Sequence, residues 1–314
     1  MQSCTLIAPA KINLYLEIIG DRSDGYHELA MILQSIDLAD QIHIQKSSID
    51  SIRVRCNDPQ VPIDKSNLAY KAAALMNAKY PEAFIKHGGL NISIKKRIPV
   101  SAGLAGGSTD AAAVLLGINL LWELGLSKSE LEELGARLGS DIPFCIAGGT
   151  AIATGRGEQL APLPSLDNIH IVLAKYRSLE VSTPWAYKTY RQQFRSTYIQ
   201  DRESLAARAE AVHSSNMVKG ILHKDTKEIV QQLHNDLEKV VLPEFPIVLE
   251  LRETLTNAGV LGAMMSGSGP SVFAICESKQ QAEEVKSHVR KKIPDQELEL
   301  FVAQSIAHGI QLAP

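Results

Sequence analysis

The feature that most constrains the fold is a glycine-rich stretch that runs directly into a long series of small and apolar residues. The stretch is Gly103–Thr109, and the apolar series continues to about Leu124. The series predicts a buried helix, and the glycines before it allow positive φ angles and a close ligand approach. Free N–H groups and the positive dipole end at a helix start favour an anion. The pattern therefore favours a phosphate site over a tight turn that only packs a helix on a sheet.

Two familiar phosphate motifs do not match this chain. The stretch lacks the lysine of the GxxxxGKS/T motif, and it lacks the GxGxxG spacing of dinucleotide-binding proteins. A second small-residue loop, Met265–Pro270, joins two apolar runs that predict strands. Taken alone, this second loop is typical of a hairpin turn.

A strict alternation near the start predicts a half-buried strand over Lys11–Ile18. Lys11 and Asn13 should therefore share one face, away from the core. The alternation assigns Ile12, Leu14, Leu16 and Ile18 to the core side, and Lys11, Asn13, Tyr15 and Glu17 to the other.

Three polar positions are candidates for chemistry, although each has an ordinary structural explanation. Asp141 lies in the apolar context Leu138–Phe144, at a predicted helix start, where a cap is the usual role of an aspartate. Lys11 alone is typical of a solvated strand lysine. The pair Tyr26-His27 follows a turn and can be an aromatic plug.

The remaining pattern predicts two α+β domains, 1–162 and 163–314, divided by a loose linker around 158–167. Ser66 and the pair Ser127/Glu130 should cap helices. The polar segment Arg191–Ser215 is expected to be a surface excursion. Further strands are expected at 41–45, 51–56, 90–95, 168–174, 260–265, 271–276 and 297–303, and further helices at 225–241, 245–258 and 280–291.

Charge and composition narrow the class of protein. Lysine plus arginine is 32 and aspartate plus glutamate is 35, so the formal net charge is −3, which argues against a nucleic-acid or anionic-membrane partner. Four dispersed cysteines without a CxxC pair, and nine histidines without HExxH, argue against a zinc site or a disulfide scaffold. The first residues do not resemble a signal peptide, and the run Ala111–Trp122 is too short to span a bilayer. A cytoplasmic enzyme is expected.

Together, three motifs in order resemble those of the GHMP kinase superfamily: Pro9–Leu14, Pro99–Thr109 and Gly262–Ser271. Gly25–His27, Ser140–Phe144 and Gly155–Glu158 resemble the members that act on a cytidine-diphosphate-linked methylerythritol. Two positions depart from the usual pattern, because Asp110 replaces a common asparagine and Ala105 a frequent glycine. The resemblance covers nearly the whole chain.

The resemblance implies a two-lobed GHMP kinase fold of the α+β class, with the site in the cleft. One lobe should be ribosomal-protein-S5-domain-2-like and the C-terminal lobe ferredoxin-like. The implied reaction transfers the γ-phosphate of ATP to the 2-hydroxyl of the cytidine-linked substrate, in non-mevalonate isoprenoid precursor synthesis. Mg²⁺ would be held mainly by phosphates and water, with no metal-ligating residues in the chain. The implied partner is that small molecule, and the chain is expected to be a monomer or homodimer.

The resemblance also implies residue roles. Asp141 is the matching base for the attacking hydroxyl, and Lys11 favours the developing alkoxide. Ser108 and Thr109 offer hydroxyls to phosphate or, through water, to Mg²⁺. The implied ATP-binding residues are Pro99, Val100, Ser101, Ala102, Gly103, Leu104, Ala105, Gly106, Gly107, Ser108 and Thr109, and the implied substrate-binding residues are Asn13, Tyr26, His27, Thr183 and Tyr187.

Two alternatives remain open from the sequence. One is a different kinase of the same superfamily, acting on mevalonate, homoserine or a sugar. The other is a non-catalytic binding module, because the nucleotide lobe's fold type also occurs in RNA-associated proteins and fold alone does not fix function.

Overall fold

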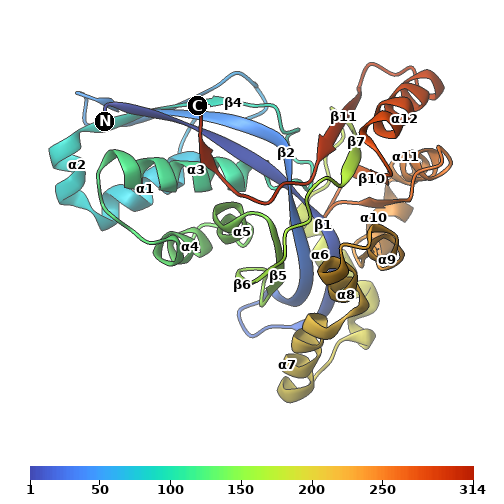
Figure 1. Ribbon diagram of the computed structural model, residues 1–314. Helices are drawn as coiled ribbons and strands as arrows, with labels where there is room; N and C mark the ends of the chain where they lie inside the picture. The colour runs from blue at the N-terminus through green and yellow to red at the C-terminus, as the bar shows by residue number, and fades with distance from the viewer.

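A computed structural model describes residues 1–314, apart from the side chain of Arg202. The chain forms two lobes joined by one long hairpin, β1 (Ser3–Asp21) and β2 (His27–Ser47) (Figure 1). The start of β1 and the end of β2 belong to the sheet of the first lobe, and the part of the hairpin that leads to its turn bends down between the lobes. Leu16 and Ile18 of β1 pack in the same cluster as Val172 and Val248 of the second lobe, so the hairpin contributes to both cores.

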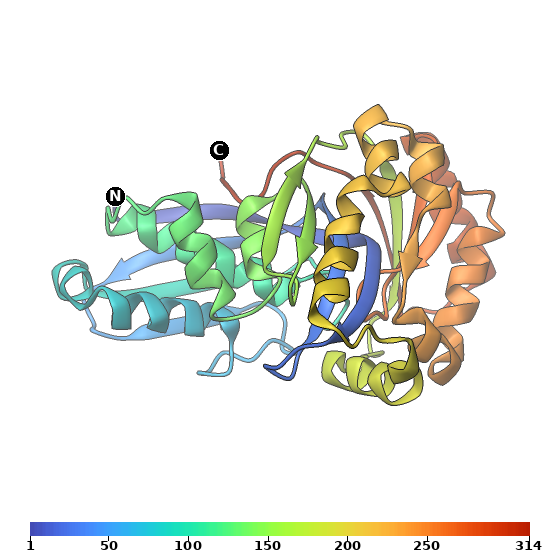
Figure 2. The same cartoon turned by 90° about the horizontal axis from the view of Figure 1, so that it is seen from below.

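The first lobe is a mixed sheet with helices on one face (Figures 1 and 2). Its strand order is β12-β1-β2-β4-β3, with β5 paired to β2, β6 to β5 and β8 to β1. Its further strands are β3 (Ile52–Cys56), β4 (Gly89–Lys95), β5 (Thr150–Thr154), β6 (Gln159–Leu163), β8 (His234–Asn235) and β12 (Gln311–Leu312). Its helices are α1 (Leu68–Lys79), α2 (Pro81–His87), α3 (Gly106–Leu121), α4 (Lys128–Ala136) and α5 (Ile142–Ala147).

Helix α3 is the buried helix that the apolar series predicts, and it packs against β1 and β2. Small residues allow a close approach: a Cβ on Gly117 would lie 2.5 Å from Ile44 Cδ1 of β2. The helix begins inside the glycine-rich stretch, at Gly106, after Ala105 with φ 58°. The first turn of the helix therefore consists of residues that the sequence suggested for a loop.

The second lobe confirms the expected ferredoxin-like arrangement. Strands and helices alternate as β7, α11, β9, β10, α12 and β11, and the sheet order is β11-β7-β10-β9 with every pair antiparallel. This is the βαββαβ pattern of that fold. The bounds are β7 (His170–Tyr176), α11 (Pro246–Thr256), β9 (Gly262–Met265), β10 (Val272–Cys276), α12 (Lys279–Lys292) and β11 (Leu298–Gln304).

The remaining helices lie beside the lower part of the hairpin (Figure 1). They are α6 (Thr183–Phe194), η1 (Arg195–Thr197), α7 (Arg202–Ala211), η2 (Val212–Ser214), α8 (Asn216–His223), α9 (Thr226–Gln231) and α10 (Glu238–Glu244). The segment Arg191–Ser215 is thus largely helical. It is anchored as well as exposed, since Tyr198 and Val212 are buried.

The single helix expected at 225–241 is wrong. It divides into α9 and α10 around the short strand β8, which pairs with Tyr15 and Leu16 of β1. The cause is Asn235, whose Nδ2 donates to the carbonyls of Met265 and Gly267 at 2.8 Å each. These long-range bonds favour an extended backbone where the local pattern favoured a helix.

The alternation along β1 is also only partly correct. A register shift lies between Asn13 and Tyr15, so one residue is inserted and the faces exchange. Lys11 and Asn13 share a face as predicted, but beyond the bulge it is Leu16 that lines the same cavity, whereas Tyr15 packs on the other side. Lys11 and Asn13 are moreover buried, with 4% and 1% of their surface exposed.

Two helix caps test the local reading of the sequence. The capping box of Ser127 and Glu130 is confirmed at the start of α4. The cap of α1 is Asn67 instead of Ser66, because the Asn67 Oδ1 accepts from Ala69 N at 2.7 Å while Ser66 bonds to Asp64.

The expected linker around 158–167 contains strand β6, which is paired with β5. Pro162 is tolerated there because β6 has only one neighbour and its other edge is free. The domain boundary between 162 and 163 stays a prediction, and the chain returns at its end to place β12 beside β1. Among the described residues, no helix is long and apolar enough to cross a lipid bilayer.

Candidate active site

A cavity of about 1080 Å³ lies between the lobes. Its walls come from β1, the turn between β1 and β2, the glycine-rich stretch, the residues around Asp141, the start of α6 and the loop 267–269. Segments from the beginning, middle and end of the chain therefore meet at one site. The three motifs noted in the sequence all contribute lining residues.

The glycine-rich stretch forms one wall. The cavity is lined by most of this stretch and by the four residues before it: Pro99, Val100, Ser101, Ala102, Gly103, Ala105, Gly106, Gly107 and Ser108. The first turn of α3 thus presents its free N–H groups and its positive dipole end to the cavity. Leu104 and Thr109 do not line it, and their side chains are buried, at 1% and 0% exposure. The geometry gives no support to a phosphate contact from the Thr109 hydroxyl.

Gly103 shows why this wall needs glycine. Its φ is +71°, and a Cβ there would lie 2.1 Å from the carbonyl oxygen of Ser266. The Ser266 Oγ donates to the Gly103 carbonyl at 3.2 Å. The loop Met265–Pro270, read from sequence as a simple hairpin turn, therefore packs directly on the glycine-rich stretch and closes the cavity on the second-lobe side.

The structure brings Lys11 and Asp141 together. Lys11 Nζ lies 3.8 Å from Asp141 Oδ2, and it donates to Asn13 Oδ1 at 2.7 Å and to the carbonyl of Gly103 at 3.2 Å. Asp141 precedes α5, but its side chain makes no capping hydrogen bond. Its side chain is 33% exposed and lines the cavity, so the carboxylate is available to a ligand.

An aromatic group lies at another end of the cavity. The ring centroids of His27 and Tyr187 are 5.3 Å apart, and those of His27 and Tyr198 are 5.8 Å apart with the rings nearly perpendicular. Tyr26 is 52% exposed, with the Arg156 guanidinium 5.1 Å over its ring. Burial, and then the charge of Arg191, lower the pKa of His27 to about 4 against the opposing effect of Asp21, so the imidazole is neutral at neutral pH.

Thr183 lies at the start of α6 and also lines the cavity. Its hydroxyl forms a hydrogen bond of 2.7 Å with that of Ser268. All five predicted substrate residues therefore line one cavity: Asn13, Tyr26, His27, Thr183 and Tyr187. Arg156 and Arg191 line it too: Arg156 belongs to the motif Gly155–Glu158, although it was not predicted as a site residue, and Arg191 was missed because it belongs to no local motif.

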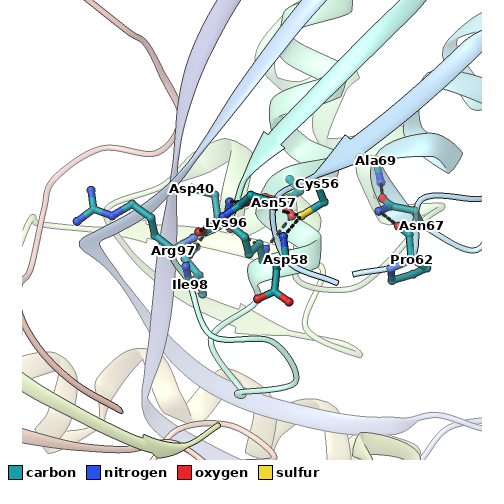
Figure 3. A network of polar contacts seen from close by, with 11 residues as sticks. Asp40, Cys56, Asn57, Asp58, Pro62, Asn67, Ala69, Lys96, Arg97 and Ile98 are labelled. Carbon is teal, nitrogen blue, oxygen red and sulfur yellow. Dashed lines mark hydrogen bonds and ion pairs between the residues drawn. The ribbon is translucent and has the colours of Figure 1, made fainter. Parts of the chain in front are cut away.

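A buried charge network lies beneath the start of α3. Lys96 Nζ donates to Asp40 Oδ2 at 2.6 Å and to Asp110 Oδ2 at 2.7 Å. Asp40 Oδ1 accepts from the backbone N–H groups of Arg97 and Ile98 (Figure 3). Burial would lower the pKa of Lys96, but the two carboxylates together raise it, whereas burial raises the pKa of Asp110 despite Lys96. The aspartate at 110, unusual for the resembled family, thus has a lysine partner.

Two asparagines order the backbone around this network (Figure 3). Asn57 pairs with both backbone groups of Lys96, accepting from its N–H at 2.6 Å and donating to its carbonyl at 3.4 Å. Asn67 donates to the carbonyl of Pro62 at 2.5 Å while it caps α1. Pro62 and Asn67 line the cavity together with Lys96, so these bonds shape its wall.

The residues that line the cavity show which groups could bind a metal ion. Among the described residues, no three histidine, cysteine, aspartate or glutamate side chains are grouped so that they could hold a metal. The hydroxyl of Ser108 and the carboxylates of Asp110, Asp141 and Glu180 line the cavity, and Mg²⁺ accepts oxygen ligands of these kinds alongside phosphate and water.

Comparison with known proteins identifies the class that this fold and site define. The family model described as GHMP kinases N terminal domain matches residues 67–149, and the model described as GHMP kinases C terminal matches residues 217–295. The chain belongs to the GHMP kinases, which confirms the resemblance seen in the sequence. Members of this family use ATP as co-substrate.

Within that family the chain belongs with the 4-diphosphocytidyl-2-C-methyl-D-erythritol kinases. It is 72% identical to the protein of that name from Nostoc punctiforme over 99% of both chains. It is 68% identical to the Nostoc sp. protein and 54% identical to the Synechocystis sp. protein of the same name, again over 99% of both chains.

Solved structures of similar fold agree with this family assignment. A crystal structure of 4-(cytidine 5'-diphospho)-2C-methyl-D-erythritol kinase is 30% identical, with a TM-score of 0.73 over 96% of this chain and 98% of the other. A homoserine kinase from Cytophaga hutchinsonii has a TM-score of 0.72 at 20% identity, over 100% of this chain and 98% of the other. The latter shows the shared fold alone.

Proposed function

We propose that this chain transfers the γ-phosphate of ATP to the 2-hydroxyl of 4-(cytidine 5'-diphospho)-2-C-methyl-D-erythritol. The observation that carries the proposal is the convergence of Lys11 and Asp141, 3.8 Å apart, in a cavity that also contains a helix N-terminus and an aromatic group. Relatives that bear the name of this kinase over nearly the whole chain support the same substrate. Its product serves isoprenoid precursor synthesis by the non-mevalonate route.

The nucleotide is bound by the glycine-rich wall in this proposal. Gly106, Gly107 and Ser108 are the first residues of α3, so their N–H groups have no helical acceptor and can donate to the β- and γ-phosphates. The Ser108 hydroxyl adds a further donor. Mg²⁺, when it binds with the nucleotide, would neutralise phosphate charge, held by phosphate, water and Ser108.

Asp141 is the base for the attacking hydroxyl. An oxygen placed between its carboxylate and the γ-phosphate loses its proton to Asp141 as the new O–P bond forms, while the bond from the γ-phosphorus to the β–γ bridging oxygen breaks and ADP leaves. Lys11 stabilises the negative charge that develops on this oxygen. The bonds from Lys11 to Asn13 and to the Gly103 carbonyl fix its ammonium group, so little reorganisation is needed during the reaction.

The cytidine end is bound by the aromatic group. A neutral His27 has one ring N–H and one acceptor nitrogen, which suits the mixed donors and acceptors of a cytosine edge. Tyr26 and Tyr187 offer flat rings, and stacking of a base on an aromatic side chain contributes about 1–3 kcal/mol. Thr183 and Asn13 are polar contacts along the path between the base and the reacting hydroxyl.

The experiment offers γ-labelled ATP and the purified chain to a panel of alcohols. The panel holds the cytidine-linked substrate, the same polyol phosphate without the cytidine group, homoserine and mevalonate. We expect label only in the cytidine-linked product, at its 2-oxygen by NMR. Faster labelling of homoserine or mevalonate would assign the chain to another kinase activity of the family, and labelling of none would remove the kinase proposal.

A further inference from the structure

The turn between β1 and β2 carries Tyr26 and leads directly into His27, the first residue of β2. Its tip is exposed, and a Cβ on Gly25 would meet no atom within 4 Å. Backbone bonds close the turn: Arg22 N donates to the Tyr26 carbonyl at 2.9 Å, and Gly25 N donates to the Arg22 carbonyl at 3.2 Å. Tyr26 N donates to Asp24 Oδ1 at 3.1 Å, and the Arg22 side chain binds Asp24 and Glu28. All of these bonds stay within the hairpin, so the placement of the turn against the cavity depends on support from other elements.

That support comes from one arginine of helix α6. Arg191 Nε donates to Asp21 Oδ1 at 2.7 Å, and its Nη2 donates to the carbonyls of Gly25 at 3.0 Å and of Tyr26 at 3.4 Å. One guanidinium thus joins the beginning and the end of the turn. Figure 2 shows the turn, in blue, beside the yellow-green helix that carries Arg191.

His27 is the binding residue whose position depends most on this arrangement. It is 5% exposed, lines the cavity, and its Nε2 has no hydrogen-bond partner among the described residues. A buried ring nitrogen without a partner costs free energy unless a ligand satisfies it. The groups that face the imidazole are Arg191 and Tyr187 from α6, Asp21 from β1, and Tyr198 beyond η1.

We propose that Arg191 is a positioning residue for the cytidine end of the site, which holds the turn so that Tyr26 and His27 are placed to bind the base. The inference rests on the proposed function and deepens it. An arginine suits this role because its planar fork donates at once to a carboxylate and to backbone carbonyls, which a lysine cannot do in fixed geometry. The segment that begins at Arg191 thereby gains a role in recognition.

The chain offers a matched control. Arg195 comes from the same segment and approaches the same carboxylate, with its Nε 3.6 Å from Asp21 Oδ2. Its side chain is 72% exposed and it does not line the cavity. Arg195→Met therefore removes an equal charge near Asp21 without removing the bonds to the turn.

The experiment compares Arg191→Met, Arg191→Lys and Arg195→Met with the wild type in steady-state kinetics. For Arg191→Met we expect KM for the cytidine-linked substrate to rise about tenfold, which corresponds to about 1.4 kcal/mol, while kcat and KM for ATP stay within about twofold. Arg191→Lys should recover only part of the loss, and Arg195→Met should match the wild type. An unchanged KM in Arg191→Met, an equal loss of ATP affinity, or an equal effect of Arg195→Met would each overturn the proposal.

A pH profile gives a readout that simple misfolding would not produce. Removing the Arg191 cation raises the pKa of His27 from about 4, so the acid-side fall in kcat/KM should move to higher pH in Arg191→Met only. A fall that stays in place would remove His27 from the argument and overturn the proposal. Calorimetric binding of cytidine 5'-diphosphate repeats the comparison without turnover. A wild type that neither binds nor phosphorylates cytidine compounds refutes the proposed function, whereas equal binding by wild type and Arg191→Met refutes this inference alone.

Discussion

Replacing Asp141 by asparagine should separate catalysis from binding and folding. The substitution keeps the size of the side chain and removes the group that accepts the proton. General-base catalysis typically contributes ~10²–10⁴-fold, equivalent to about 3–5 kcal/mol of barrier, so kcat should fall by that factor. Folding should hardly change, because the carboxylate makes no capping bond and is one-third exposed. At 3.8 Å from Lys11, a partly exposed pair contributes about 0–1 kcal/mol.

The assay combines ADP release with calorimetric ATP binding and thermal unfolding. We expect a kcat reduced at least about a hundredfold, an ATP dissociation constant within about twofold of the wild type, and a nearly unchanged Tm. Lys11→Met supplies the contrast: it leaves the buried Asn13 Oδ1 without its donor, at about 1–3 kcal/mol, so it should lose stability as well as rate. An Asp141→Asn variant that retains more than about a tenth of wild-type kcat would refute the base role.

Three further predictions follow from single contacts. Gly107→Val should raise KM for ATP about tenfold or more without lowering Tm, because a Cβ there meets only Leu68 at 3.6 Å and otherwise points into the cavity; steady-state kinetics and calorimetry check this. Gly103→Ala should lower the free energy of unfolding by about 2 kcal/mol or more in urea titration, since its Cβ meets a backbone oxygen at 2.1 Å with φ at +71°. Burial would raise the pKa of Asp236, but hydrogen bonds from His234, Lys239 and a backbone N–H lower it to about 2. In urea titration, the free energy of unfolding of the wild type should therefore exceed that of Asp236→Asn by about 2 kcal/mol at neutral pH. This difference should be lost as the pH falls from about 5 to about 2, and a difference that persists at the lower pH would contradict the assignment.

Much of the site was predictable because its parts lie in local motifs. The small and apolar run after Gly103 predicts α3, and the ordered motifs predict the meeting of Lys11 with Asp141, which the structure shows. What local patterns could not give is the depth of burial. Lys11 lies in the wall of a cavity instead of on a solvated strand, where it contacts Asn13, Gly103 and Asp141 from three separate segments of the chain.

The errors have a common physical origin in long-range contacts. The bulge after Asn13 exchanges the two faces of β1, although the local alternation is perfect. The side chain of Asn235 breaks a helix because its partners lie some 30 residues away in the chain. Arg191 and the pair of Lys96 with Asp110 were likewise invisible, because their meaning lies in partners from other elements.

The C-terminal segment returns from the second lobe to the first and so connects the two lobes once more. Residues 305–313 run back over the first lobe: Ile306 N donates to Ser35 O, and Ala313 N donates to Thr5 O. With the β1–β2 hairpin and the connection to β7, the peptide chain crosses between the halves several times. Each of these crossings is a covalent connection between the two lobes, so rotation of one lobe against the other would have to distort several segments at once. Deleting the last ten residues would remove one of these connections and leave the two lobes less rigidly joined.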